Sequence, residues 1–119
     1  MEQPNKIGKH GEKIAEEFLE NTGYKIISKN YRTIFGEIDI IARKDNTIIF
    51  VEVKTRSGNK YGVPQLAVNK YKQKHLARAA IAFIKRNSLN SDYRFDIIAI
   101  INDKIEHIQN AFAVSGYTI

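Results

Sequence analysis

The chain contains no cysteine, which excludes disulfides, thiolate nucleophiles and cysteine-ligated zinc sites. It also has no apolar run of membrane-spanning length, and its N-terminal residues lack the hydrophobic segment of a signal peptide. No GxGxxG, P-loop or GxSxG pattern occurs, which argues against dinucleotide, nucleoside triphosphate and acyl-transfer chemistry. We therefore expect a cytoplasmic protein with no membrane segment.

The composition is that of a globular chain with an excess of positive charge. Of the 119 residues, 43% are hydrophobic and 27% are charged, and this length suits one domain over residues 1–119 but not two. The 19 basic residues outnumber the 13 acidic ones, so the net charge of +6 and the pI near 9.6 favour polyanions such as nucleic acid. Charge alone leaves the question open, because small basic proteins that bind no nucleic acid are common.

Hydrophobic periodicity predicts helix, three strands, helix and two strands, in that order. The first helix stops at Thr22-Gly23, since glycine suits the position after a helix. Gly8 and Gly11 on its apolar side indicate that another element approaches closely. The second helix is long enough to cross over between strands of one sheet, so we predict an α/β fold with a mixed central sheet flanked by helices. The predicted helices cover residues 5–21 and about 68–86, and the strands cover residues 24–32, 35–43, 47–55, 94–101 and about 105–112.

The predicted hairpin between the second and third strands carries charged residues at one end of otherwise apolar runs. If its turn centres on Asp45-Asn46, antiparallel pairing places Asp39 opposite Glu52. Two residues further on, the same register places Glu37 opposite Lys54, and alternation puts all four side chains on one face. Directly opposed like charges, with Cβ atoms about 4.5–5.5 Å apart, are destabilising, so the two facing carboxylates need a reason.

A divalent cation supplies that reason. Mg²⁺ is typically held by one or two carboxylates together with waters and substrate phosphates, and Lys54 beside it would act on the attacking water or on transition-state charge. Asp39, Glu52 and Lys54 thus match a phosphodiesterase site. The alternative is a solvated sheet face on which Lys54 pairs with Glu37. On that face Asp39 would pair with Arg43, but the nearly continuous apolar runs indicate a sheet covered on both faces.

Two further segments offer contacts for a substrate. A helical wheel places Lys72 and Gln73 on the apolar side of the second helix, where they could reach the carboxylates or a phosphate. Snorkelling of Lys72 to solvent is the alternative. The loop TRSGNKYG offers Arg56, Lys60 and Tyr61 as phosphate and base contacts, or it is an ordinary basic surface loop. The three histidines show no metal-ligand spacing.

Several motifs resemble those of known nucleases. GEIDII and FVEVKTR resemble the PD-(D/E)xK signature of restriction-endonuclease-like nucleases, although Ile38 stands where the superfamily name has proline. Together with GKHGEKIAEEFLENTGYKIISKNYR, the pair Lys72-Gln73, RFDIIAI and IEHIQNAF, they resemble the YraN family over nearly the whole chain. That family is similar in fold to archaeal Holliday junction resolvases, which are Mg²⁺-dependent homodimeric endonucleases. The resemblance implies a restriction-endonuclease-like α-β-β-β-α-β core, DNA as the partner, Mg²⁺ or Mn²⁺ as the cofactor, and a homodimer.

The resemblance also implies roles for individual residues. Lys54 would be the catalytic lysine, and Glu12 would match a glutamate of the first helix that joins such sites. Glu37 belongs to the YraN-type motif as well, either as part of the site or as a residue that positions Lys54. The implied metal ligands are Asp39, Glu52 and the main-chain carbonyl of Val53.

Two classes of function remain open at this point. The first is a Mg²⁺-dependent DNA endonuclease, acting for example on branched or damaged DNA in repair or recombination. The second is a non-catalytic module that binds nucleic acid or a protein partner on a nuclease-like fold. The intact Asp, Glu and Lys set favours the enzyme, because opposed carboxylates would repel phosphate in a protein that only binds.

Overall fold

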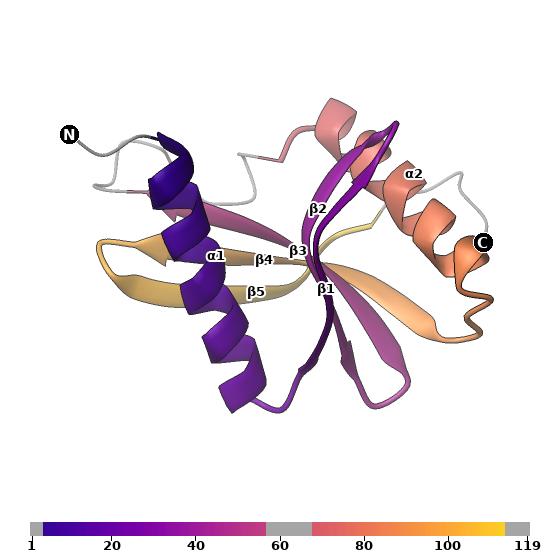
Figure 1. Ribbon diagram of the computed structural model, residues 1–119, viewed down its shortest axis with the longest axis horizontal. Helices are drawn as coiled ribbons and strands as arrows, with labels where there is room; N and C mark the ends of the chain where they lie inside the picture. Colours follow the sequence, from indigo (N-terminus) through magenta and orange to yellow (C-terminus); the bar gives the residue numbers. More distant parts are fainter. Residues whose placement is uncertain (1–3, 57–67, 114–119) are drawn as a thin grey trace.

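The computed structural model describes residues 4–56 and 68–113, which form a five-stranded sheet with a helix on each face (Figure 1). The strand order is β1-β2-β3-β4-β5. This confirms the predicted α/β fold with a mixed sheet, and the element order is consistent with a restriction-endonuclease-like core. The elements are α1 (Pro4–Asn21), β1 (Lys25–Thr33), β2 (Gly36–Lys44), β3 (Thr47–Arg56), α2 (Lys70–Arg86), β4 (Asp92–Ile101) and β5 (Lys104–Phe112).

The sheet is mixed because α2 crosses over between β3 and β4. These two strands pair in parallel, whereas the other three neighbouring pairs are antiparallel. The hairpin of β2 and β3 turns at Asp45-Asn46 as predicted, with Lys44 opposite Thr47 and the same register continuing to Ile40 opposite Val51. The prediction of the turn and of the register beside it is confirmed.

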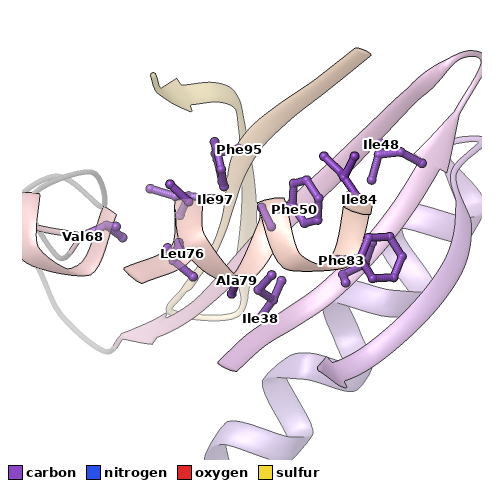
Figure 2. Close-up of a cluster of buried hydrophobic side chains, with 13 residues drawn as sticks. Ile38, Ile48, Phe50, Val68, Leu76, Ala79, Phe83, Ile84, Phe95 and Ile97 are labelled. Carbon is purple, nitrogen blue, oxygen red and sulfur yellow. The ribbon is translucent and has the colours of Figure 1, made fainter. Parts of the chain in front are cut away.

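Each face of the sheet carries its own hydrophobic core. On one face Phe50 of β3 packs with Phe83 and Leu76 of α2 (Figure 2). On the other face the next residue along β3, Val51, packs with Leu19 of α1. Alternate residues of β3 are therefore buried on opposite sides, which explains why its sequence reads as one continuous apolar run.

Helix α1 lies directly on the end of β3. A Cβ atom added at Gly11 would collide with Oγ1 of Thr55, so glycine permits the close approach that the sequence predicted there. The surroundings of Gly8 lie outside the described part. The helix ends as predicted, because Gly23 has a φ of +95° and the N–H of Tyr24 donates to the carbonyl of Leu19 at 2.9 Å.

Helix α2 begins at Lys70, two residues later than the sequence pattern suggested. Asn69 is its N-cap, and its side-chain oxygen accepts the N–H of Lys72 at 2.9 Å. This cap sets the phase of the first turn, which decides where the side chain of Lys72 points. Within residues 4–56 and 68–113, neither helix is long and apolar enough to cross a lipid bilayer.

Candidate active site

The β2–β3 hairpin opens at the end that carries the charged residues. Its described ladder ends at Ile40 and Val51, and beyond it the carboxylate of Asp39 accepts the N–H of Val53 (Oδ2–N 2.8 Å). Ile38 packs in the core under α2, whereas Ile40 packs in the core under α1. In a regular strand residues two apart share a face, so β2 twists through Asp39. The carboxylate of Asp39 thus fills the fork between two separating strands.

This twist corrects the predicted arrangement of the four charged side chains on one face. The described β2–β3 ladder ends at Ile40 and Val51, so the predicted pairing of Glu37 with Lys54 is absent from it. On the other side of β2, Glu37 pairs with Arg32 of β1, in the ladder and by an ion pair of 3.6 Å. The direct pairing of Asp39 with Glu52 is likewise absent from the described β2–β3 ladder. The prediction extended the hairpin register past Ile40 and Val51, where the described β2–β3 ladder ends.

Glu52 is the centre of an ion-pair cluster on the α2 side of the sheet. It is only 6% exposed, and its Oε1 accepts the ammonium of Lys72 at 2.6 Å and lies 3.3 Å from Nζ of Lys54. The predicted inward position of Lys72 is therefore confirmed, whereas Gln73 turns back and donates to the carbonyl of Val68 at 2.9 Å. A buried carboxylate needs such partners, since an unpaired buried charge is costly.

The surroundings raise the pKa values of Asp39 and Lys72 but lower that of Lys54. Burial and the neighbouring charge of Glu52 raise the pKa of Asp39 to about 7, against the effect of the Val53 N–H, and Glu12 raises it further. Burial and the adjacent Lys72 lower the pKa of Lys54. Burial alone would lower the pKa of Lys72 as well, but the hydrogen bond and charge of Glu52 raise it. The cluster holds an acid that ionises reluctantly beside an amine that loses its proton more readily than usual.

A cavity of about 440 Å³ opens on the α1 side of Asp39, and Glu12 and Lys29 are among its lining residues. Glu12 thus lies where the sequence placed it, within electrostatic reach of Asp39. Asn30 of β1, which sequence reasoning missed, joins this side of the cluster. With its amide nitrogen turned to the carboxylates, Asn30 donates to Oε1 of Glu12 at 2.6 Å and to Oε1 of Glu37 at 2.8 Å.

Asn30 sits in the left-handed region, with a φ of +52°. Asparagine is several-fold enriched at such positions, and that is the one signal in the sequence that could have found it. Of the predicted DNA contacts, Arg56 ends β3 and its Nη1 donates to the carbonyl of Thr55 at 3.1 Å. Lys60 and Tyr61 lie outside the described residues.

The donor set fits a hard divalent cation that keeps part of its hydration shell. In the described part of the chain no three His, Asp or Glu side chains form a closed metal site. Asp39 and Glu52 offer two carboxylates, and Mg²⁺ is typically bound by one or two carboxylates with waters and substrate phosphates filling the rest. Burial and the charges of Glu52 and Glu12 raise the pKa of Asp39 and so disfavour its charged form. A bound cation would favour that charged form.

Fold and site together define an α/β protein with a restriction-endonuclease-like core, in which Asp39, Glu52 and Lys54 meet where β2 and β3 part. The family model described as "Uncharacterised protein family UPF0102" matches residues 11–100, and the chain belongs to this family. All the site residues fall within the match. UPF0102 is the YraN-like family, so the membership that the sequence motifs predicted is confirmed.

Proteins of the same family in several bacteria are similar over most of their length. The chain is 51% identical to a UPF0102 protein of Thermodesulfovibrio yellowstonii over 106 residues, which is 89% of this chain and 95% of that protein. It is 46% identical to a UPF0102 protein of Geobacter metallireducens, over 92% and 93% of the two chains. A UPF0102 protein of Chloroherpeton thalassium is 52% identical, over 89% of this chain and 81% of its own.

Proposed function

We propose that the protein is a Mg²⁺- or Mn²⁺-dependent endonuclease that hydrolyses phosphodiester bonds of DNA in the cytoplasm. The observation that carries this proposal is the meeting of Asp39, Glu52 and Lys54 at the fork between β2 and β3. A module that only bound nucleic acid would gain nothing from buried carboxylates, because they repel phosphate. A nuclease needs them, because they recruit the cation that neutralises the phosphate.

In this proposal the carboxylates of Asp39 and Glu52 and the carbonyl of Val53 would hold the metal. When bound, a hard divalent cation polarises the scissile phosphate and lowers the pKa of a coordinated water. The bond from the Val53 N–H orients the Asp39 carboxylate, so this ligand is positioned before the metal arrives. Glu12, Asn30 and Glu37 support the α1 side of Asp39 through the two Asn30 hydrogen bonds.

The two lysines would have different roles in catalysis. The lowered pKa of Lys54 suits a side chain that orients the attacking water and accepts its proton. Lys72, which keeps its charge through Glu52, would contact a phosphate oxygen and offset the charge of the transition state. Glu52 touches both ammonium groups and therefore sets their spacing.

The decisive experiment is a cleavage assay. Purified protein is incubated with junction, flap, single-stranded and blunt duplex DNA in Mg²⁺, in Mn²⁺ and in EDTA. Cleavage of at least one DNA form should occur with metal, stop in EDTA, and fail with Asp39→Asn. Binding without cleavage of any form in either metal would instead support the second candidate function, a non-catalytic module.

DNA binding itself should be dominated by phosphate contacts, because the excess of positive charge is spread over the chain. For about four neutralised phosphates, the logarithm of affinity for duplex DNA should fall with a slope near −3.6 against the logarithm of salt concentration. We include Arg56, Lys60, Tyr61, Lys72 and Gln73 among the contact residues. The homodimer implied by the resolvase resemblance is measured by sedimentation in the same buffers.

A further inference from the structure

Two large apolar side chains project into solvent near the start of α2 and the turn between β1 and β2. Tyr71 of α2 is 73% exposed, and Ile34 in the turn is 94% exposed. Figure 1 shows the tip of the β1–β2 hairpin beside the first turns of α2. Single exposed apolar residues are common on protein surfaces, but here the aromatic ring belongs to the helical turn that also carries Lys72, which contacts Glu52.

The ring of Tyr71 is held in place although most of it is exposed. It packs against the ring of His75 one helical turn later, with centroids 4.3 Å apart and planes tilted by 48°. His75 is itself anchored, because its Nδ1 shares a hydrogen bond of 2.6 Å with the carbonyl of Phe35 in the β1–β2 turn. The turn therefore orients His75, and His75 supports one side of Tyr71.

Tyr71 lies in the same turn of α2 as a residue of the candidate active site. The next residue is Lys72, whose ammonium lies 2.6 Å from Oε1 of Glu52. Arg32, with a side chain 82% exposed, lies on β1 just before the turn that holds His75. A base on the Tyr71 ring would thus lie on the helical turn that supplies Lys72 to the candidate site, and near the hairpin that carries Arg32.

We propose that Tyr71, supported by His75, stacks an unpaired nucleobase, so that the substrates are DNAs with unpaired nucleotides beside the cleaved bond. This role rests on the proposed function, because it names the substrate class of the same site. Exposed aromatic rings bind bases of single strands without sequence preference, since every base has a π-face. In a continuous duplex both faces of each base are already stacked, and a base must leave the helix to reach such a ring.

The test is a binding measurement that needs no catalysis. Full-length protein in EDTA is titrated into labelled single-stranded DNA and into blunt duplex DNA of equal length, and affinity is read from fluorescence anisotropy. Tyr71→Ala should weaken single-strand binding roughly 10-fold and duplex binding less than about 2-fold. Tyr71→Phe should keep the parental affinity, because it retains the ring. His75→Ala should lie between the two.

A control residue, Tyr93 of β4, lies near the opposite end of α2. Tyr93, 38% exposed, lines a separate pocket with Ile84 and Lys85 near the C-terminus of that helix. Tyr93→Ala should leave the ratio of single-strand to duplex affinity unchanged. Thermal melts of every variant confirm that the protein is folded, and if Tyr71→Ala is unstable, Tyr71→Leu, which keeps an apolar side chain without a ring, takes its place with the same expected loss.

A spectroscopic readout reports stacking directly. A single strand that contains 2-aminopurine should change its fluorescence on binding the parent and Tyr71→Phe, but not Tyr71→Ala. Equal loss of single-strand and duplex affinity, or no loss of either, would overturn the stacking role. The two proposals fail separately: a protein that cleaves no DNA but shows the Tyr71 effect refutes the nuclease alone, and cleavage without that effect refutes the stacking role alone.

Discussion

Asp39 of β2 and Asp96 of β4 are both strand residues, but their surroundings shift the pKa values of the two carboxyl groups in opposite directions. Asp96 is fully buried. Its carboxylate oxygens accept hydrogen bonds from Nε of Arg94 at 2.9 Å, the N–H of Asn110 at 2.9 Å and Nε2 of His107 at 2.7 Å. Burial alone would raise the pKa of Asp96, but the bonds from His107, Arg94 and Asn110 outweigh it and lower that pKa. At Asp39, burial and the charges of Glu52 and Glu12 outweigh the hydrogen bond from the Val53 N–H, so the pKa of Asp39 rises.

The difference separates a structural cluster from the candidate metal site proposed above. Around Asp96, the guanidinium of Arg94 also donates to the hydroxyl of Tyr24 at 2.6 Å, so this network connects β4 and β5 to the segment between α1 and β1. A complete network of this kind stabilises the fold and needs nothing more. The Asp39 cluster keeps an unfavourable charge that a cation would relieve, and such uncompensated groups are typical of functional sites.

The largest effect is expected at the complete network. Asp96→Ala removes the buried acceptor of hydrogen bonds from Arg94, His107 and Asn110 and leaves Arg94 without its counter-charge, so the free energy of unfolding should fall by about 3–5 kcal/mol. Urea denaturation of the metal-free protein measures it. Glu106→Ala, at an exposed position of β5, serves as the control and should change stability by less than about 0.5 kcal/mol. A loss below about 1 kcal/mol for Asp96→Ala would contradict a structural role.

A smaller change, in catalysis and not in stability, is expected for Lys54. Lys54→Ala should lower turnover by roughly 10² or more while metal and DNA binding stay largely intact. The measurement compares single-turnover cleavage with anisotropy titrations. Lys74→Ala, which removes an exposed lysine of α2, is the control for general loss of charge. If the Lys54 variant cuts like the parent, this lysine merely neutralises Glu52.

The pH dependence of stability should have opposite signs at the two acids. A raised pKa means that folded protein binds the Asp39 proton more tightly, so this contribution is fully present below about pH 4 and is lost as the pH rises toward about 7. The lowered pKa of Asp96 stabilises above about pH 4 and is lost as the pH falls below it. Melting temperatures from pH 3 to pH 8 should show both slopes for the parent, whereas Asp39→Asn and Asp96→Asn should each lose one of them. Parallel curves for all three proteins would refute the contrast.

The smallest effect is expected for Asp39→Asn at neutral pH. Asparagine keeps an acceptor for the Val53 N–H but removes the repulsion with Glu52 and Glu12, so the metal-free protein should gain a few tenths to about 1 kcal/mol. The stabilisation that Mg²⁺ or Mn²⁺ gives the parent should shrink or vanish in the variant. Thermal melts with and without metal measure both. Glu106→Gln, at an exposed position of β5 outside the site, is the control and should keep the metal response.

A neutral or destabilising Asp39→Asn, with no metal response in either protein, would show that this acid is an ordinary surface charge. That outcome would remove the metal site and the nuclease proposal together. It would leave the fold, the family and the Asp96 network as they stand.

Much of the fold was predictable because its causes are local. The apolar run of β3, whose residues are buried on alternate faces, and the turn at Asp45-Asn46 fix the register of the hairpin near the turn. Lys72 was placed correctly because helical periodicity decides which side of α2 it occupies. The prediction failed for Glu37, since nothing in GEIDII signals where two strands stop pairing.

The sequence by itself determined the order of the elements, the two-sided burial of the sheet and the acids and lysine that a nuclease site requires. These follow from periodicity, turn chemistry and motif, which act between residues close in the chain. Only the tertiary structure decided the fork at Asp39, the bridge from Asn30, the partners of Asp96 and the ring of Tyr71 on His75. Each of these depends on strand twist and on contacts between distant segments, which no local pattern encodes.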